Sequence, residues 1–580
     1  MKILFLTHAF NSLTQRLFVE LAARGHEVTV ELDVNDAVSE EAVRLARPDV
    51  VIAPFLKRAI PASIWSRVRT LVVHPGIVGD RGPAALDWAI QEGEREWGVT
   101  VLEATGEMDA GPVWASHEFP MREAAKGSLY RAEVTEAAVR GVLEALEKVR
   151  DPAFRPEPLD YARPGVRGRL RPPMRQADRA IDWARDDAAT VLAKIRAADG
   201  FPGVLDSLCG EPVYLYDAHP EDTLRGGEPG AVIAKRGGAI LRATADGPVW
   251  IGHLKRQAEG PQLKLPAAMV LGERLEGVPE AELAIDARPA GRTFRDLWYE
   301  EAGAVGYLHF AFYNGAMSTG QCQRLAEAIR FAKSRPTRVL ALLGGPDYWS
   351  NGIHLNVIEA SPHPADESWA NINAIDDVAL EILTADRQLT VAAMQGNAGA
   401  GGVFLALAAD RVLARRGVIL NPHYKGMGNL YGSEYWTYLL PRRVGADRAR
   451  AITEDRLPID APRAAELGLI DACGPAAAEA FGAWVRAEAE ALAARPDFAG
   501  QLAAKAARRA ADEAAKPLAE YRAEELERMK LNFYGFDPSY HVARYHFVFK
   551  VPKSRTPLYL ARHRAARPVE RARAPEGVAA

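Results

Sequence analysis

The sequence predicts a multidomain α/β protein with a doubly wound α/β domain, a small β-rich domain, and a second α/β domain that ends in long helices. Three observations support this prediction. The chain has 580 residues, too many for one core at roughly 100–200 residues per domain. Short apolar runs alternate with helical patterns before residue 165 and again after residue 285. Between these two regions lie short strand patterns separated by Gly turns.

The first 165 residues predict a parallel sheet with helices on both faces. The expected strands lie at residues 3–7, 28–32, 50–53 and 70–73, and the expected helices at 13–24 and 40–46. This β–α–β alternation favours a doubly wound sheet. Binding sites in such sheets lie beyond the carboxyl ends of the strands. His74 directly follows the fourth expected strand and is therefore a candidate site residue.

Changes in composition set the expected domain boundaries. Residues 151–173 contain six prolines, which is typical of an exposed linker. The expected domains are residues 1–165, a small β-rich, OB-like domain at 166–280 with a helix at 186–198, and a second α/β domain at 285–555 with Ala-rich helices between 476 and 530. The basic segment 556–580 is expected to be a disordered tail, with a docking arm as the alternative.

Composition and charge narrow the class of protein. The net charge of −4 argues against a nucleic-acid partner. Cys209, Cys322 and Cys473 lie far apart and lack metal-ligand spacing, so we expect a reducing compartment and no metal. No apolar run reaches the length of a membrane span, and the N-terminal apolar run is too short for a signal peptide. A cytoplasmic enzyme without a membrane partner is the expectation.

A histidine and an aspartate in the first domain form a candidate catalytic site. His74 stands in Val72-Val73-His74-Pro75-Gly76, and Asp109 begins Asp109-Ala110-Gly111-Pro112. An imidazole that titrates near neutrality can take a proton from an acceptor and return one to a leaving group. These motifs resemble the tetrahydrofolate-dependent formyltransferase and deformylase families. Further along, Ile181-Asp182-Trp183 resembles the C-terminal domain of methionyl-tRNA formyltransferases.

This resemblance implies 10-formyltetrahydrofolate as the formyl donor, with His74 and Asp109 as catalytic residues and Asp109 orienting the imidazole or a relaying water. The matching folate loop supplies the candidate cofactor-binding residues Phe55, Leu56, Lys57 and Arg58. The alternative is that the two charged side chains of this loop are only solvated.

One position departs from the formyltransferase pattern. The family has an Asn that stabilises an oxyanion where this sequence has Val72. Loss of such a donor costs roughly two to three powers of ten in rate. Either another donor replaces it, with Asn11 and Gln15 as guesses, or the acceptor needs less help. A thiol acceptor fits the second possibility, because thiolate is a strong nucleophile.

Two glycine-rich turns carry a second candidate site. One lies in residues 344–355 after a strand at 339–343, and the other in residues 395–404 after a strand at 389–394. Such turns expose N–H groups at helix N-termini. The segments resemble the crotonase (enoyl-CoA hydratase/isomerase) family, whose oxyanion-hole N–H groups match Ile353 and Gly401 here. The resemblance implies that coenzyme A binds near four further residues, Ser350, Asn351, Gly352 and Gly402. The alternative is that the glycines only form tight turns.

The two carboxylates that hold water in enoyl-CoA hydratases are absent. Their positions match Phe404 and His423, which argues against hydration. Glu434 lies in the aromatic segment 431–438 and is hard to place in a core, because a buried carboxylate needs a partner. His423 and Glu434 are therefore the acid–base candidates. Tyr431 and Ser433 are expected to contact the cofactor. The alternative is an aromatic helix packed in the core.

Taken together, the two halves resemble the HypX/HoxX family of [NiFe]-hydrogenase maturation factors over essentially the whole chain. The strings that carry this resemblance include residues 312–319, 350–356 and 421–425. It implies carbon monoxide synthesis, in which a formyl group passes from 10-formyltetrahydrofolate to coenzyme A and formyl-CoA then decomposes to CO and CoA. The second step needs a site without water, which Phe404 fits.

Two alternatives stay open. One is an N-formyltransferase that acts on an amine and carries a degenerate crotonase scaffold. The other is a non-catalytic CoA- or folate-binding partner of the hydrogenase large-subunit precursor or of its maturation proteins.

Overall fold

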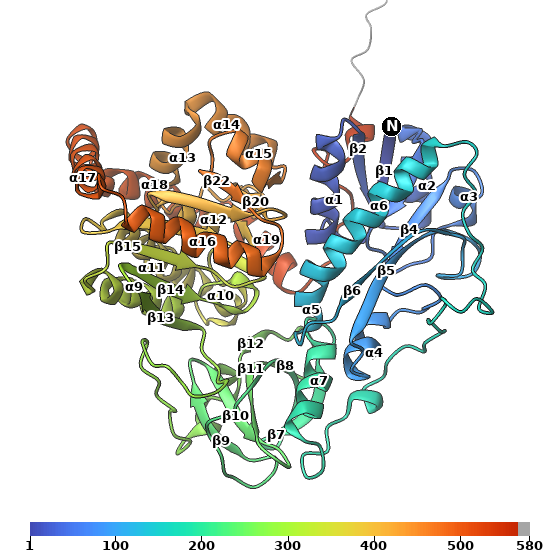
Figure 1. The fold of residues 1–580 in the computed structure, drawn as a ribbon, viewed down its shortest axis with the longest axis horizontal. Coiled ribbons are helices and arrows are strands. Elements are labelled where there is room, and N and C mark those ends of the chain that lie inside the picture. Colours follow the sequence, from blue (N-terminus) through green and yellow to red (C-terminus); the bar gives the residue numbers. More distant parts are fainter. Residues whose placement is uncertain (566–580) are drawn as a thin grey trace, which may run out of the picture.

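Four sheets organise residues 1–565, the part of the chain that the computed structural model describes. An N-terminal unit and a larger C-terminal unit lie side by side, and a small β unit lies below and between them (Figure 1). The combination of a doubly wound sheet, a small β sheet and a second α/β unit confirms the predicted fold class.

The N-terminal sheet has the order β2-β1-β3-β4-β5-β6. The first four strands run parallel, and β5 and β6 are antiparallel to their neighbours. Helices α1 and α6 cover one face, whereas α2 and α3 cover the other. The predicted strands are confirmed to within one residue. The strands are β1 (Lys2–Thr7), β2 (Glu27–Leu32), β3 (Val50–Ala53), β4 (Thr70–His74), β5 (Glu96–Glu103) and β6 (Val113–Pro120), and the helices are α1 (Ser12–Ala23), α2 (Asp36–Ala46), α3 (Ala62–Trp65), α4 (Ala85–Gln91), α5 (Lys126–Leu129), the π-helical turn η1 (Tyr130–Val134) and α6 (Thr135–Arg150).

The small unit is an antiparallel sheet with one long helix packed on it. Asp187 caps the helix by accepting a hydrogen bond from the backbone N–H of Thr190, as expected for an Asp N-cap. The sheet order is β7-β8-β11-β10-β9, with β12 paired to β11. The elements are η2 (Ala177–Arg179), α7 (Ala188–Ala198), β7 (Val204–Leu208), β8 (Glu211–Pro220), β9 (Val232–Arg236), β10 (Ala239–Ala243), β11 (Pro248–Arg256), β12 (Lys264–Pro266), α8 (Ala267–Leu271) and η3 (Gly272–Leu275).

The C-terminal unit has a main sheet, β13-β14-β15-β17-β19-β22, and a smaller sheet, β16-β18-β20-β21. Two strands that precede the glycine-rich turns, β15 and β17, have the predicted bounds. The strands are β13 (Leu297–Ala302), β14 (Val305–Phe310), β15 (Val339–Leu343), β16 (Tyr348–Ser350), β17 (Leu389–Met394), β18 (Asn397–Gly399), β19 (Arg411–Arg415), β20 (Ile419–Asn421), β21 (Ile459–Asp460) and β22 (Ala472–Gly474).

Helices surround both sheets of this unit, and the predicted Ala-rich helices are present. The helices are η4 (Tyr313–Gly315), α9 (Thr319–Ser334), α10 (Leu355–Ala360), α11 (Pro364–Leu383), α12 (Gly401–Leu407), α13 (Trp436–Val444), α14 (Ala446–Asp455), α15 (Ala461–Glu466), α16 (Ala478–Ala493), α17 (Phe498–Ala515), α18 (Leu518–Tyr534) and α19 (Ser539–Val548).

The end of the described chain returns to the N-terminal unit, which corrects the prediction of a disordered tail from residue 556. The N–H of Leu32 donates to Thr556 Oγ1 at 2.7 Å, and the N–H of Val30 donates to the carbonyl of Leu560 at 3.0 Å. Strand β2 is the edge of its sheet, so its outward N–H groups need partners, and this segment supplies them. The turn η5 (Arg562–Arg564) follows, beside β2 (Figure 1). The rest of the predicted tail, 566–580, lies outside the described residues.

The proline-rich connection after α6 runs along the N-terminal unit. Most of residues 151–170 are exposed. Two short β-bridges attach this segment, Val113 with Glu157 and Arg81 with Leu170. Arg171 at its end is buried, with 6% of its surface exposed, and its side chain reaches the first candidate site.

Candidate functional site

His74 is the last residue of β4, at the carboxyl edge of the N-terminal sheet. Its Nε2 lies 2.9 Å from Asp80 Oδ2, and its Nδ1 lies 3.5 Å from Asp109 Oδ2. Both His74 and Asp80 are buried, whereas the Asp109 side chain is 12% exposed. The structure therefore brings the two predicted residues together and adds a second carboxylate that sequence reasoning missed.

Asp80 is held by a short turn and by an arginine from the linker. A Cβ at Gly76 would lie 2.4 Å from His74 Nε2 and 2.6 Å from Asp80 Oδ2, so glycine is required for this close approach. Arg171 Nε donates to the other oxygen of Asp80 at 3.0 Å. The predicted orienting residue, Asp109, instead has a left-handed backbone and accepts the N–H of Gly82 at 3.2 Å. The shorter carboxylate contact to the imidazole belongs to Asp80.

The predicted folate loop follows β3 on the same edge of the sheet. The Phe55 carbonyl accepts the backbone N–H of His8 at 2.7 Å, and Leu56 packs against the core between the sheet and α2. Arg58 pairs with Asp36 at 2.6 Å at the surface, as the solvated alternative expected. Lys57 has a different partner, since its Nζ lies 5.8 Å from the centre of the Phe201 ring.

The π-helical turn η1 adds an aromatic residue beside this loop. The ring of Tyr130 lies 6.2 Å from that of Phe55 in an edge-on arrangement. Asn11 Nδ2 lies 3.5 Å from the Tyr130 hydroxyl. Single π turns inside helices are common at functional sites. No composition signal in the sequence pointed to this turn.

No hydrogen bond links His74 to Asn11 or Gln15, the two guessed replacements for the missing Asn. The Asn11 side chain caps α1 by accepting the N–H of Thr14 at 3.0 Å. Gln15 Nε2 donates to the Phe10 carbonyl at 2.9 Å, and its Oε1 accepts from Asn421. Both amides are therefore engaged elsewhere.

The two glycine-rich turns of the C-terminal unit meet at one point. A Cβ at Gly352 would lie 3.6 Å from the backbone N of Gly401, and a Cβ at Gly402 would lie 2.0 Å from the Ser350 carbonyl oxygen. The close approach thus requires glycine at Gly402, and a φ of 77° favours glycine at Gly352. Gly401 opens α12, and Ile353 directly follows Gly352. The predicted oxyanion donors therefore lie on adjoining segments.

Two predicted CoA-contact residues hold the first turn in shape. The Ser350 hydroxyl accepts the N–H of Gly352 at 3.1 Å, and Asn351 Nδ2 donates to the Asn314 carbonyl at 2.8 Å. His354 caps α10 by accepting the N–H of Val357 at 3.3 Å. Burial lowers the pKa of His354 to about 3, so its imidazole is neutral.

Glu434 lies directly against Gly401. A Cβ at Gly401 would lie 2.0 Å from Glu434 Oε1. Glu434 Oε2 accepts the Tyr424 hydroxyl at 2.5 Å, whereas Oε1 makes no hydrogen bond to the described residues. Glu434 and Tyr435 both have left-handed backbones, with φ of 61° and 58°. Two successive non-glycine residues in this region are strained, and such strain clusters at functional sites.

Two further buried carboxylates hold this strained turn. Asp376 accepts the N–H of Glu434 and the hydroxyl of Ser433, both at 2.8 Å. Glu525 from α18 accepts the N–H of Tyr435 at 2.9 Å. Burial, together with the Asp376 carboxylate, raises the pKa of Glu434 well above its usual range. Burial also raises the pKa of Glu525 to about 8.

Aromatic residues pack around the Glu434 side chain. Phe404 is fully buried and stacks on the Tyr424 ring with centres 5.4 Å apart. The Trp436 ring lies 6.3 Å from that of Phe404. The position that holds a water-binding Glu in hydratases thus presents a phenyl ring. The aromatic segment is an irregular turn that leads into α13, and is not a helix over its whole length.

The structure does not bring His423 to Glu434. Tyr424 contacts the glutamate, whereas the charged neighbours of His423 are Arg456 and Lys425. Burial, followed by the nearby charge of Arg456, lowers the pKa of His423 to about 4. Tyr431, at 38% exposed, packs on Trp436. Tyr424 is the partner of Glu434 that sequence reasoning missed.

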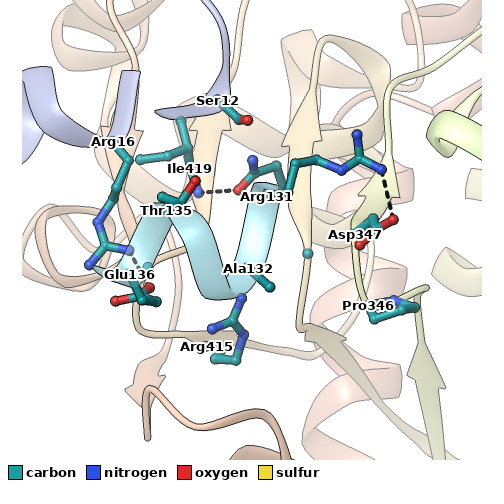
Figure 2. Close-up of a pocket in the computed structure, with 13 residues that line it drawn as sticks. Ser12, Arg16, Arg131, Ala132, Thr135, Glu136, Pro346, Asp347, Arg415 and Ile419 are labelled. Carbon is teal, nitrogen blue, oxygen red and sulfur yellow. Dashed lines mark hydrogen bonds and ion pairs between the residues drawn. The ribbon is translucent and has the colours of Figure 1, made fainter. Parts of the chain in front are cut away.

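The N-terminal unit is tied to both turns of the second site. Arg131 donates to Asp347 at 2.8 Å, as Figure 2 shows, and the Ser128 hydroxyl donates to the same carboxylate at 2.7 Å. Asn421 Nδ2 donates to Gln15 Oε1 at 3.0 Å, and its carbonyl accepts the N–H of Ala400 at 2.9 Å, one residue before Gly401. The polar pocket in Figure 2 lies at this junction.

Within residues 1–565, no group of three or more His, Cys, Asp or Glu side chains is arranged to hold a metal ion. In the same range, no helix is both long and apolar enough to cross a membrane.

Three segments of the chain match known families. Residues 10–146 match the formyl transferase family, and residues 173–263 match the formyl transferase C-terminal domain. Residues 313–533 match the enoyl-CoA hydratase/isomerase family.

Individual relatives also match, and two of those named here do so along nearly the full length of the chain. The hydrogenase maturation factor HoxX of Bradyrhizobium diazoefficiens is 58% identical over 567 residues, 98% of each chain. The crystal structure of HypX from Aquifex aeolicus in complex with tetrahydrofolic acid is 51% identical, with a TM-score of 0.94 over 98% of this chain and 99% of that one. The methionyl-tRNA formyltransferase of Thermotoga maritima is 27% identical over 41% of this chain and 75% of that protein.

Proposed function

The chain belongs to the HypX/HoxX family of hydrogenase maturation factors, and from this premise we propose that it makes carbon monoxide for the [NiFe]-hydrogenase active site. In the first step, a formyl group passes from 10-formyltetrahydrofolate to the thiol of coenzyme A. In the second step, formyl-CoA splits into CO and CoA. The protein is then a formyltransferase and a lyase in one chain.

For the first step, His74 is the proton-transfer residue. The short contact to buried Asp80 supports Nε2–H as the fixed proton, which leaves Nδ1 to take the thiol proton and return it to N10 of the folate. Asp109 then lies beside that reacting nitrogen. The tetrahydrofolic acid in the Aquifex aeolicus structure supports folate as the donor. The folate contacts are assigned to Phe55, Leu56, Lys57 and the neighbouring Tyr130.

Coenzyme A is assigned to the junction of the three units. Its thioester end belongs between Ile353 and Gly401. Its charged end needs cations without a carboxylate partner, and Lys264 is a candidate. Lys264 Nζ contacts the Gly200 carbonyl and the Tyr313 hydroxyl, each at 3.1 Å. Burial lowers the pKa of Lys264 to about 8, which an anionic ligand would reverse.

For the second step, Glu434 takes the proton of the formyl group and later gives it to sulfur. The C–H electron pair stays on carbon, the C–S bond breaks with its electrons on sulfur, and CO leaves. The proton then passes from Glu434 to the thiolate. Water would divert formyl-CoA to formate, so the aromatic wall at Phe404 suits this reaction. His423 is not assigned a role in this step.

The observation that carries the proposal is the contact of Glu434 with Gly401. A buried carboxylate, with one oxygen free of hydrogen bonds, faces the position where a thioester carbonyl binds in crotonases. The three cysteines are free thiols, which fits a cytoplasmic setting. The hydrogenase large-subunit precursor or its maturation proteins are the proposed recipients of the CO.

Headspace detection of CO tests the proposal. The full chain is mixed with 10-formyltetrahydrofolate carrying a labelled formyl carbon and with coenzyme A. Labelled CO that requires both compounds is the expected result. Formyl transfer to an amine without CO would favour the N-formyltransferase alternative. Binding of both compounds without turnover would favour a non-catalytic partner.

A further inference from the structure

Three carboxylates from separate elements meet behind the second site. Glu434 belongs to the turn before α13, Asp376 to α11 and Glu525 to α18, and they are 1%, 0% and 0% exposed. The Ser433 hydroxyl lies between two of them, 2.8 Å from Asp376 Oδ2 and 3.4 Å from Glu525 Oε2. We call these three residues the carboxylate cluster.

The charges around the cluster do not balance. Within residues 1–565, the cation that faces it is Arg522, whose Nε lies 3.6 Å from Asp376 Oδ2. Arg522 is shared, because its Nη1 pairs with exposed Asp377 at 2.6 Å. The other titratable groups that face the cluster are neutral or acidic: Tyr424, Tyr435 and Cys322. Like charges packed this closely cannot all ionise, so the cluster retains at least one proton.

Hydrogen bonds decide where that proton resides. Asp376 accepts an N–H and an O–H and faces Arg522, and Glu525 accepts the N–H groups of Tyr435 and Thr437 at 2.9 and 2.8 Å. These hydrogen bonds favour the ionised form of both groups and oppose the effect of burial, which raises the pKa of each. Glu434 Oε2 accepts the Tyr424 hydroxyl at 2.5 Å and the Ser433 N–H at 3.2 Å, whereas its Oε1 accepts no hydrogen bond from the described residues. We therefore place the shared proton at this free oxygen of Glu434, beside the thioester position.

We propose that Asp376 and Glu525 are positioning residues that make Glu434 a stronger base through their negative charge. The inference rests on the proposed decarbonylation. Removal of a formyl proton needs a base stronger than an ordinary carboxylate. The same two residues hold the strained turn, because each accepts an N–H of a left-handed residue.

The atoms balance within this scheme. Ionised Glu434 takes the formyl proton, the C–H pair stays on carbon, the C–S pair goes to sulfur, and the proton passes to the thiolate. Asp376 and Glu525 exchange no atoms with the substrate. They act only on the proton affinity of Glu434, so their effect should be seen in the pH dependence of the rate.

The pH profile of CO release from formyl-CoA by the full chain tests the inference. In wild type, burial among carboxylates raises the pKa of Glu434 to about 8, so the rate should rise with pH through that range. Asp376→Asn keeps the volume, and its amide can donate to the Ser433 hydroxyl. We expect it to move the profile to lower pH by roughly one unit and to lower the limiting rate about three- to tenfold, because the base is weaker.

Asp377→Asn is the matched control. It removes the same charge from the next residue, which is 55% exposed and pairs with the same arginine. The pH profile of CO release by this variant should coincide with that of wild type. An unshifted profile in Asp376→Asn, or an equal shift in both variants, overturns the inference.

Infrared titration of the intact protein gives an answer that does not depend on activity. A protonated carboxyl band should be lost between about pH 7 and pH 9 in wild type, and the part of this band that belongs to Glu434 should be missing in Glu434→Gln. Absence of this band in wild type overturns the inference even if Asp376→Asn fails to fold. If wild type makes no CO but the band is present, the proposed function fails and the proton-sharing cluster stands.

Discussion

In the N-terminal site, His74 lies between two carboxylates, and each carboxylate has its own partner. Arg171 donates to Asp80, and the N–H of Gly82 donates to Asp109. In the C-terminal site, three carboxylates are buried together, and the arginine that faces them, Arg522, pairs with Asp376 and with the surface residue Asp377. Each carboxylate of the first site thus has a hydrogen-bond donor of its own, although Arg171 also pairs with Glu92 at 2.6 Å. The carboxylates of the second site are packed together, and the cluster retains a proton.

This difference matches the chemistry proposed for each site. Formyl transfer moves a proton between a thiol and an amine, and a histidine side chain can accept and return that proton. Decarbonylation removes a proton from carbon, which needs a stronger base in a dry site. The aromatic rings around Glu434 keep water away, and the carboxylates behind it raise its proton affinity. Both effects favour removal of a proton from carbon. The first site has no comparable wall, since the Asp109 side chain is partly exposed.

The largest expected effect separates the two sites. Glu434→Gln should lower CO release by about two to four powers of ten while coenzyme A is still formylated, because His74 lies in another unit. Formyl-CoA or formate should accumulate. The measurement is headspace CO beside chromatography of CoA esters. Normal CO yield from this variant would remove Glu434 from the mechanism.

Changes at the first site should have the reverse pattern. His74→Ala should lower formyl transfer by about two to four powers of ten. Asp80→Asn should lower it at least about tenfold, because an amide can hold the wrong tautomer of the imidazole. Consumption of 10-formyltetrahydrofolate measures the formyl-transfer activity of both variants. A smaller loss in Asp80→Asn than in Asp109→Asn would return the orienting role to Asp109.

A change in the reaction product tests whether Phe404 keeps water out of the second site. Phe404→Glu restores the carboxylate that holds water in hydratases, so labelled formyl-CoA should yield more formate and less CO. Phe404→Leu keeps an apolar wall and is the control. Equal CO-to-formate ratios in the two variants would contradict the role given to this ring.

The smallest expected effect concerns stability. The folded-state pKa of Glu434 is raised, so the folded protein binds its proton more tightly than the unfolded chain, and stability falls as pH rises from the unfolded value toward about 8. Glu434→Gln should therefore raise the melting temperature near pH 9, by about 2–4 °C for each kcal/mol recovered. A lower melting temperature would indicate a structural carboxylate.

Local sequence patterns predicted the elements and the parts of each site that lie within one turn. Strands β15 and β17 have the predicted bounds because continuous apolar runs end at glycine-rich turns. The juxtaposition of His74 with Asp109 was expected from the resemblance to the formyltransferase motifs. The pairing of His74 with Asp80 did not, since it depends on the close turn at Gly76.

The second site needed contacts that no local pattern reports. Asp376 and Glu525 sit on the buried faces of α11 and α18, and an acidic residue inside an apolar stripe was the available signal. His423 was predicted as an acid–base residue because it occupies the position of the second hydratase carboxylate. Contact of the neighbouring Tyr424 with Glu434 depends on side-chain directions in an irregular turn, which cannot be read from sequence. The return of residues 556–565 to β2 depends on an edge strand more than 500 residues earlier.

Direct supply of formyl-CoA tests the central claim, that one chain holds two separate sites for two successive steps. Formyl-CoA is given to wild type, His74→Ala and Glu434→Gln, and CO is measured in the headspace. The account predicts that His74→Ala releases CO at nearly the wild-type rate, because its defect is bypassed, and that Glu434→Gln releases almost none. Loss of CO in His74→Ala, or CO release by Glu434→Gln, would contradict the division of work between the two sites.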